Sequence, residues 1–194
     1  ADRLERALRL LASRLELAET EPVRLVVCGG AGLIALGLVQ RVTEDVDVVA
    51  LMNSDGMLGS PAPLPDFLLA AAKQVARDLG LVDSWLNNGP SRDQGGLFQM
   101  GLPTGFAERL KERVYGLRLT VYFAGRLDQI HFKLYAATDR GGVHIDDLLA
   151  LKPSAAELYQ AARWAITHDV SEGFRIVLKD LLRQLGYESV AEAI

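Results

Sequence analysis

The chain has 194 residues, a formal net charge of −4 and a single cysteine, Cys28. Its hydrophobic share of 49% and its charged share of 24% are those of a globular protein, and they exclude an intrinsically disordered chain. One cysteine excludes an internal disulfide. The longest uncharged apolar stretch, residues 25–39, contains several glycines and is too short to cross a bilayer. We therefore expect a cytoplasmic protein without a membrane partner.

The first part of the chain alternates predicted helices and strands. Leucines and alanines at helical spacing predict an amphipathic helix over residues 2–18. An apolar run at 25–28 predicts a buried strand, and glycines follow it directly at a predicted sharp turn. Residues 33–40 predict a buried helix and 48–51 a second strand.

The rest of the chain is predicted to be mostly helical. The Gly-, Ser- and Pro-rich residues 52–65 predict a loop that either closes on a substrate or is a mobile insertion. Further helices are expected over 66–80, over 127–140 and in the tail, and a strand over 117–123. These elements predict an α+β protein with a small mixed sheet flanked by helices. We expect one domain over 1–150 and a helical C-terminal region, 151–194, packed on it.

Two carboxylates stand at the entrance of the second predicted strand. Asp45 and Asp47 project from the same face if this segment is extended, because side chains alternate along a strand. Neighbouring carboxylates repel each other unless a cation joins them. The pair therefore suggests a divalent metal site beside the glycine turn.

The order of these features resembles a known family. A strand, the turn at Gly29 and Gly30, a helix and the string Arg-x-Thr-x-Asp-x-Asp at residues 41–47 are similar to the nucleotidyltransferase fold, in particular its AbiEii-like, toxin-type branch. The resemblance implies that Gly29 and Gly30 hold the phosphates of a nucleoside triphosphate. It also implies that Asp45 and Asp47 hold Mg²⁺, with Arg41 and Thr43 as further nucleotide contacts.

A second segment adds to the resemblance. Residues 127–140 resemble a family helix with a Lys-Leu-x-Ala core and a downstream Arg, here Lys133 and Arg140. Asp147 takes the position of the last acid in the family's next motif. Lys133 and Arg140 are seven residues apart on one predicted helix, so we expect them to share a face and to meet triphosphate oxygens. Asp147 is expected to orient Lys133 or the acceptor.

The resemblance implies Mg²⁺-dependent transfer of a nucleoside monophosphate from a triphosphate to a hydroxyl. The acceptor would be tRNA or another RNA, or a protein, and the chain would act as a toxin with a cognate antitoxin. The later strand of many such enzymes supplies a third carboxylate, but residues 117–123 contain none. A catalytically inactive module that binds a nucleotide or a protein partner is therefore the alternative.

Three other interpretations stay open. In the first, Asp45 and Asp47 are merely solvent-exposed charges at the end of a strand. In the second, residues 30–35 match the relaxed G-x-G-x-x-A fingerprint of a dinucleotide site. In the third, Lys133 and Asp147 form a structural ion pair between two helices.

Overall fold

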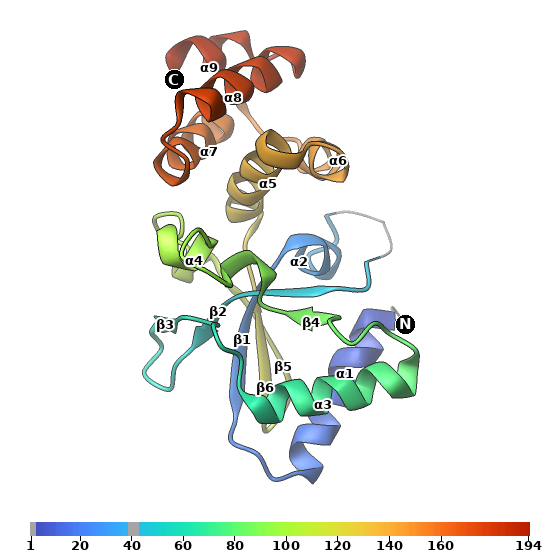
Figure 1. Cartoon of the computed structure of the whole chain (residues 1–194). Coiled ribbons are helices and arrows are strands. Elements are labelled where there is room, and N and C mark those ends of the chain that lie inside the picture. Colours follow the sequence, from blue (N-terminus) through green and yellow to red (C-terminus); the bar gives the residue numbers. More distant parts are fainter. Residues whose placement is uncertain (1–2, 39–42) are drawn as a thin grey trace. The chain divides into compact units, whose positions relative to one another are not determined.

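The structure of the chain is a computed structural model that describes residues 3–38 and 43–194. The chain divides into two compact units, Ala1–Ala124 with the described strands and the helical Gly125–Ile194 (Figure 1). The predicted α+β class with a small mixed sheet is thereby confirmed. The division differs from the boundary predicted near residue 150, because the helices that follow Ala124 pack on the helices of the tail.

The described part of the first unit contains one mixed sheet of six strands. Its order is β3–β2–β1–β6–β5, and β4 pairs with β2. β1 runs antiparallel to β2 and parallel to β6, so the end of β1 lies beside the start of β2. The sheet confirms the three predicted strands as β1, β2 and β6. The strands are β1 (Val23–Cys28), β2 (Val46–Met52), β3 (Leu58–Gly59), β4 (Leu86–Asn87), β5 (Lys111–Gly116) and β6 (Leu119–Phe123).

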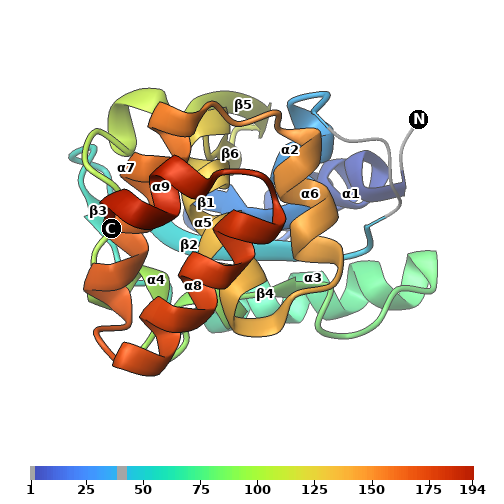
Figure 2. The same cartoon turned by 90° about the horizontal axis from the view of Figure 1, so that it is seen from above.

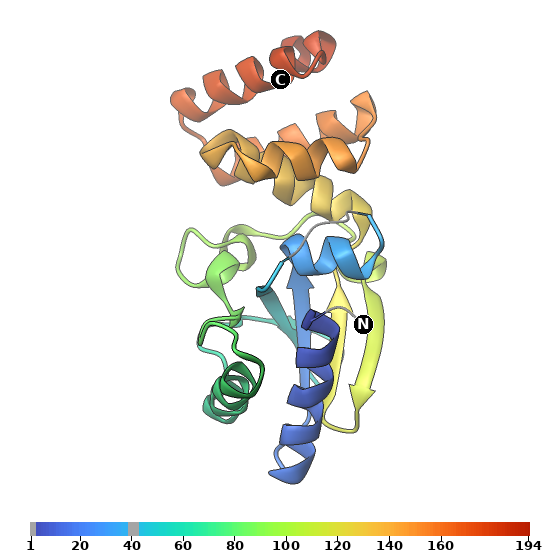
Figure 3. The same ribbon diagram turned by 90° about the vertical axis from the view of Figure 1, so that its right-hand side faces the viewer.

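Two helices pack on one face of this sheet. The apolar side chains of α1 (Arg3–Leu17) and α3 (Asp66–Leu79) form one core with those of the central strands. Figure 3 shows α1 running alongside the strands. The fully buried Trp85 belongs to this core, and its Nε1 donates a hydrogen bond to the carbonyl oxygen of Ala72 in α3 at 2.8 Å. Both predicted helices are thus confirmed, and Pro65 holds the N-cap position of α3.

One residue of β2 has no pairing partner in β1. Val26 pairs with Ala50 and Val27 with Val48, which leaves Val49 as the extra residue of a β-bulge. The carbonyl oxygen of Val49 accepts a hydrogen bond from the hydroxyl of fully buried Ser91 at 2.8 Å. The bulge therefore supplies an acceptor that anchors the segment after β4 to the sheet.

Short elements connect the larger ones in this unit. The predicted loop over 52–65 contains β3, which pairs with β2, and the side-chain amide of Asn88 donates to the carbonyl oxygen of Pro61 at 3.0 Å. Hydrogen bonds therefore hold this segment at β3 and at Pro61. The other connecting elements are the 3₁₀ turns η1 (Gly89–Ser91) and η2 (Ala107–Arg109) and the helix α4 (Leu97–Met100).

The second unit consists of helices, which Figure 2 shows from above. α5 packs on α6, α7 and α8, and α9 packs on α7 and α8. Side chains cap two of these helices: Ser154 and Glu157 form a capping box, and the Ser171 hydroxyl accepts from the backbone N–H of Phe174. Ile176 is 52% exposed, because it lies on the outer face of α8. The helices are α5 (Arg126–Arg140), α6 (Val143–Ala150), α7 (Ala155–His168), α8 (Glu172–Gln184) and α9 (Glu188–Ala193).

Arg126 connects the end of α6 to the start of α7. Its guanidinium donates to the carbonyl oxygens of Leu151 and Lys152, at 2.7 and 2.9 Å from Nη2, and Nη1 lies 2.6 Å from Oε1 of Glu157. The hydrogen bond from Arg126 is the main reason why the pKa of Glu157 lies below its ordinary value. The Arg126 side chain thus provides hydrogen bonds to two carbonyl oxygens beyond the end of α6. It also holds Glu157, a member of the capping box, in place.

No helix in the described residues is both long enough and apolar enough to span a membrane.

Candidate functional site

A glycine at the end of β1 stands directly beside the carboxylate of Asp47. Gly29 has a φ of +71°, and a Cβ at this position would lie 2.6 Å from Oδ2 of Asp47. A side chain here would require both a left-handed backbone and displacement of the carboxylate. Glycine is therefore the residue that lets the chain turn directly against Asp47.

The helix that follows the turn differs from its predicted bounds. α2 is Gly29–Ala35, so it begins and ends earlier than the predicted helix over 33–40, whose last two residues lie outside the described part of the chain. Gly30 and Gly32 are buried inside α2 rather than in a loop. The helix packs on β1 and β2, and small side chains allow this close approach. Gly30 is thus in the first turn, where backbone N–H groups have no partner within a helix.

The two aspartates lie where the sheet brings the start of β2 to the end of β1. Asp47 pairs with Cys28 in the antiparallel register and is half-buried, and Asp45 is exposed. Val46, between them, is fully buried in the core. This alternation is the one expected if both carboxylates leave the strand on the side opposite Val46.

Asn87 is a site residue that sequence reasoning missed. β4 pairs in parallel with β2, and Asn87 stands directly opposite Asp47. Its Nδ2 donates to Oδ1 of Asp47 at 3.2 Å, and its Oδ1 accepts from the backbone N–H of Gly89 at 2.8 Å. The bond from Gly89 determines which end of the amide faces the carboxylate. The sequence Asn-Asn-Gly-Pro indicates only a turn, so nothing local shows that Asn87 extends the sheet.

The oxygen donors of this site suit Mg²⁺, which takes one or two protein carboxylates and completes its coordination with water and substrate phosphates. In residues 3–38 and 43–194 no group of three or more His, Cys, Asp or Glu side chains is placed to hold a metal ion. Asp45 and Asp47 are the two carboxylates that this stretch offers for such a smaller site. Glu44, which lies between Thr43 and Asp45 in the sequence, pairs instead with Arg3 at 2.6 Å.

The remaining predicted contacts of this segment are only partly described. Thr43 is half-buried in the stretch that leads into β2. Arg41 lies outside the described residues.

The dinucleotide interpretation is wrong. Gly30, Gly32 and Ala35 do fall in a helix after a strand, as that fingerprint requires. However, the fingerprint belongs to a strand–helix–strand unit with parallel strands, and β1 and β2 are antiparallel. The start of β2 therefore lies beside the glycine turn. In a dinucleotide site the end of the second strand would lie on that side and would carry the acid.

Lys133 and Asp147 form an ion pair within the second unit. Nζ of Lys133 lies 2.7 Å from Oδ2 of Asp147, and the two side chains are only 6% and 3% exposed. The interpretation of these residues as an ion pair between two helices, here α5 and α6, is therefore confirmed. Arg140 ends α5 with its side chain 66% exposed, near Asp139. Lys133 and Arg140 thus differ in environment although they are seven residues apart on one helix.

A third carboxylate is absent from β6, as the sequence indicated. Its half-buried positions are Thr120 and Tyr122, and the register pairs Tyr122 with Val26 of β1 and with Glu112 of β5. The amide of Asn87, on the other side of Asp47, is the polar group that the described sheet places beside the carboxylate pair.

Comparisons of the chain with protein-family models, with curated proteins and with solved structures gave no match.

Proposed function

We propose that the chain transfers a nucleoside monophosphate from a triphosphate to a hydroxyl acceptor with the help of Mg²⁺. The observation that carries the proposal is the position of Gly29, a left-handed glycine so close to the strand-entrance carboxylate of Asp47 that a Cβ there would lie 2.6 Å from Oδ2. Backbone N–H groups at such a turn can bind phosphate oxygens, and the carboxylates beside it suit the cation that accompanies phosphates.

Each residue of the first unit has a distinct task in this proposal. Asp45 and Asp47 hold the metal, and Asn87 keeps the Asp47 carboxylate in place through its amide. Mg²⁺ held there would supply positive charge against the developing charge of the leaving pyrophosphate. Gly29 and Gly30 offer backbone N–H groups to the phosphates.

Contacts from outside the carboxylate pair complete the proposed nucleotide site. Thr43 contributes a hydroxyl, and the tasks of Arg41 and Arg140 in countering phosphate charge are proposed on the resemblance alone. The tasks of Lys133 and Asp147 in transfer are proposed on the resemblance alone, since the two side chains neutralise each other. We propose RNA, including tRNA, or a protein as the acceptor, and an antitoxin as a further partner.

A second candidate function is a module that binds a nucleotide or a protein without transferring anything. The absence of a carboxylate from β6 favours it, because no carboxylate on that strand can deprotonate the attacking hydroxyl. The two candidates differ in their need for the metal: an enzyme requires Mg²⁺ and both aspartates for turnover, whereas binding alone produces no covalent product.

The test is incubation of the protein with each α-³²P-labelled triphosphate, Mg²⁺ and total cellular RNA, followed by separation of RNA from protein. Asp45→Asn and Asp47→Asn remove one carboxylate charge each with little change in shape. Asp83→Asn is the matched control, because Asp83 is an exposed aspartate of the same unit.

Label that appears on RNA or protein, persists in Asp83→Asn and disappears in both site variants supports the transferase. Transfer at the parent rate by the Asp45→Asn, Asp47→Asn double variant contradicts the assigned site. If no triphosphate labels any acceptor but nucleotide binding is measurable by calorimetry, the binding module is the correct function.

A further inference from the structure

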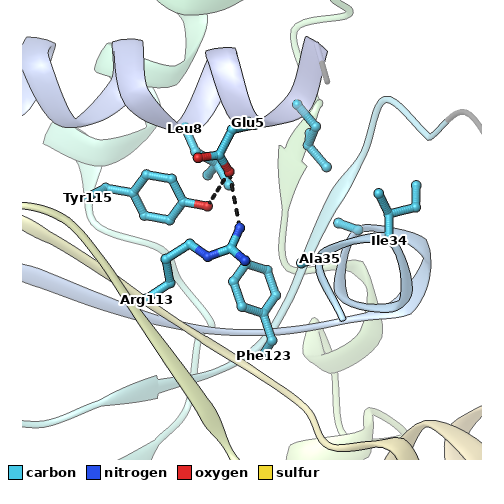
Figure 4. Close-up of a pocket in the computed structure, with 9 residues that line it drawn as sticks. Glu5, Leu8, Ile34, Ala35, Arg113, Tyr115 and Phe123 are labelled. Carbon is cyan, nitrogen blue, oxygen red and sulfur yellow. Dashed lines mark hydrogen bonds and ion pairs between the residues drawn. The ribbon is translucent and has the colours of Figure 1, made fainter. Parts of the chain in front are cut away.

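A pocket of about 240 Å³ opens in the first unit, on the side of the sheet that α1 covers. Its walls come from α1, α2, β5 and β6, which are distant in sequence (Figure 4). Most of the lining is apolar, and one group of polar side chains stands at its edge. The lining residues are Leu4, Glu5, Leu8, Ala31, Ile34, Ala35, Arg113, Tyr115 and Phe123.

The polar group is built around one carboxylate. Oε2 of Glu5 accepts from the hydroxyl of Tyr115 at 2.8 Å and from Nη1 of Arg113 at 3.2 Å, and Oε1 lies 2.8 Å from Nη2 of Arg9. Two guanidinium groups therefore share one carboxylate, which leaves a local charge of +1. An anion at this edge would complete the charge balance.

The donors at this edge keep their protons over the physiological pH range. Burial is the main cause that raises the pKa of Tyr115, to about 12, and the hydrogen bond with Tyr115 is the main cause that raises the pKa of Arg113. Tyr115 thus stays a neutral hydroxyl that donates its hydrogen bond to Glu5, and Arg113 stays a cation. The guanidinium is a planar fork, which matches the two oxygens of a carboxylate.

The apolar walls define the other end of a ligand. The guanidinium carbon of Arg113 stands 5.5 Å from the centre of the Phe123 ring, so the ring and the charge are adjacent. Leu8, Ile34 and Ala35 contribute aliphatic surface to the same pocket. A cavity of about 150 Å³ lined by such residues holds benzene. A volume of about 240 Å³ therefore has room for one ring with a substituent, or for a small fused ring system.

We propose that this pocket binds a small aromatic carboxylate, with its ring between α1 and α2 and its carboxylate on the guanidinium of Arg113. The proposal is independent of the transfer reaction, because none of the lining residues is part of the proposed metal or phosphate site. α2 nevertheless links the two sites, since it begins at Gly29 and carries the pocket residues Ala31, Ile34 and Ala35. A ligand seated against α2 thus contacts the helix that starts at the phosphate turn.

The test uses benzoate, 4-hydroxybenzoate and indole-3-carboxylate as probes and benzamide as the uncharged counterpart of benzoate. Binding is followed by ¹H–¹⁵N correlation spectra of the labelled full chain during titration. Arg113→Gln removes the charge, and Ala35→Leu fills the pocket from α2. Arg77→Gln is the matched control, because Arg77 is an exposed arginine on α3. Thermal unfolding of each variant verifies that it is folded.

We expect saturable shifts at residues of α1, α2 and β5 with at least one carboxylate. Loss of the charge-assisted contact weakens binding roughly ten- to hundredfold in Arg113→Gln, with a similar loss for benzamide. Ala35→Leu abolishes binding and Arg77→Gln leaves it unchanged. Absence of saturable shifts with all three acids overturns the proposal. So does binding that is equally tight in Arg113→Gln, or equally tight for benzamide.

Discussion

Lys133 of α5 and Asp147 of α6 face each other at 2.7 Å with almost no exposure to solvent, so each side chain neutralises the other's buried charge. Replacing one partner leaves an unpaired charge in a poorly solvated place, which costs about 3 to 5 kcal/mol of unfolding free energy. Lys133→Met and Asp147→Leu should each show this loss in denaturant titrations. The double variant should unfold at a free energy close to the parent's, because a hydrophobic pair replaces both charges at once. Additive losses in the double variant would contradict a mutually compensated pair.

Gly29 and Gly37 provide a matched pair for measuring the contact with Asp47. Both have left-handed backbones, with φ of +71° and +70°, but a Cβ at Gly37 would meet no atom within 4 Å. Alanine at either position should therefore pay the left-handed strain of about 1 to 2 kcal/mol. Gly29→Ala should lose more, because its Cβ displaces the Asp47 carboxylate from Asn87. Equal unfolding free energies for the two variants would show that Asp47 moves aside without cost.

Asn87 gives a test of the metal site that does not depend on turnover. Asn87→Asp replaces the amide donor, 3.2 Å from Oδ1 of Asp47, by a third carboxylate. Repulsion should lower the melting temperature in EDTA, and Mg²⁺ should raise it more than in the parent, because a cation joins the three carboxylates. Asn88→Asp is the neighbouring control, since Asn88 bonds to Pro61 rather than to Asp47. An equal Mg²⁺ effect in both variants would place the ion elsewhere.

Glu157 makes the second unit sensitive to acid. The hydrogen bond from Arg126 is the first cause, and the backbone N–H of Ser154 a further one, that lowers the pKa of Glu157 below its ordinary value of 4.5. A lowered pKa in the folded state means that the stabilisation is fully present above the ordinary pKa and is lost as the pH falls through the folded one. Melting curves between pH 3 and pH 7 should therefore show less acid sensitivity for Glu157→Gln. Glu172→Gln, in the first turn of α8, should keep the sensitivity of the parent.

Elements with long, regular patterns were predictable from the sequence. The helical spacing of α1 and α3 and the apolar runs of β1 and β2 depend on one buried face each, and these are local properties. α2 was predicted too late in the chain, because glycine has low helix propensity and only packing on the sheet explains a helix that begins at Gly29. Tertiary packing, rather than local helix propensity, thus determines where α2 begins.

The candidate site was predictable only as far as it is local. Gly29, Asp45 and Asp47 lie in one stretch with a readable order, so the sequence indicated them together. Asn87 belongs to a two-residue strand that exists because it pairs with β2, and such a strand has no periodicity to detect. The ion pair between Lys133 and Asp147 was only one of two interpretations, because the charges alone do not reveal burial.

The hydrogen bonds that tie β4 and η1 to β2 also set an order of events during synthesis. Asn87 lies 40 residues after Asp47, and Ser91 lies 42 residues after Val49. A ribosome that adds about 5 to 20 residues per second needs about 2 to 8 s to cover such a distance. During that time the nascent chain contains Asp47 and Val49 but not yet Asn87 and Ser91, which donate hydrogen bonds to them. A ribosome stalled between residues 50 and 85 would therefore hold a chain with the glycine turn and both carboxylates but without the amide that orients Asp47.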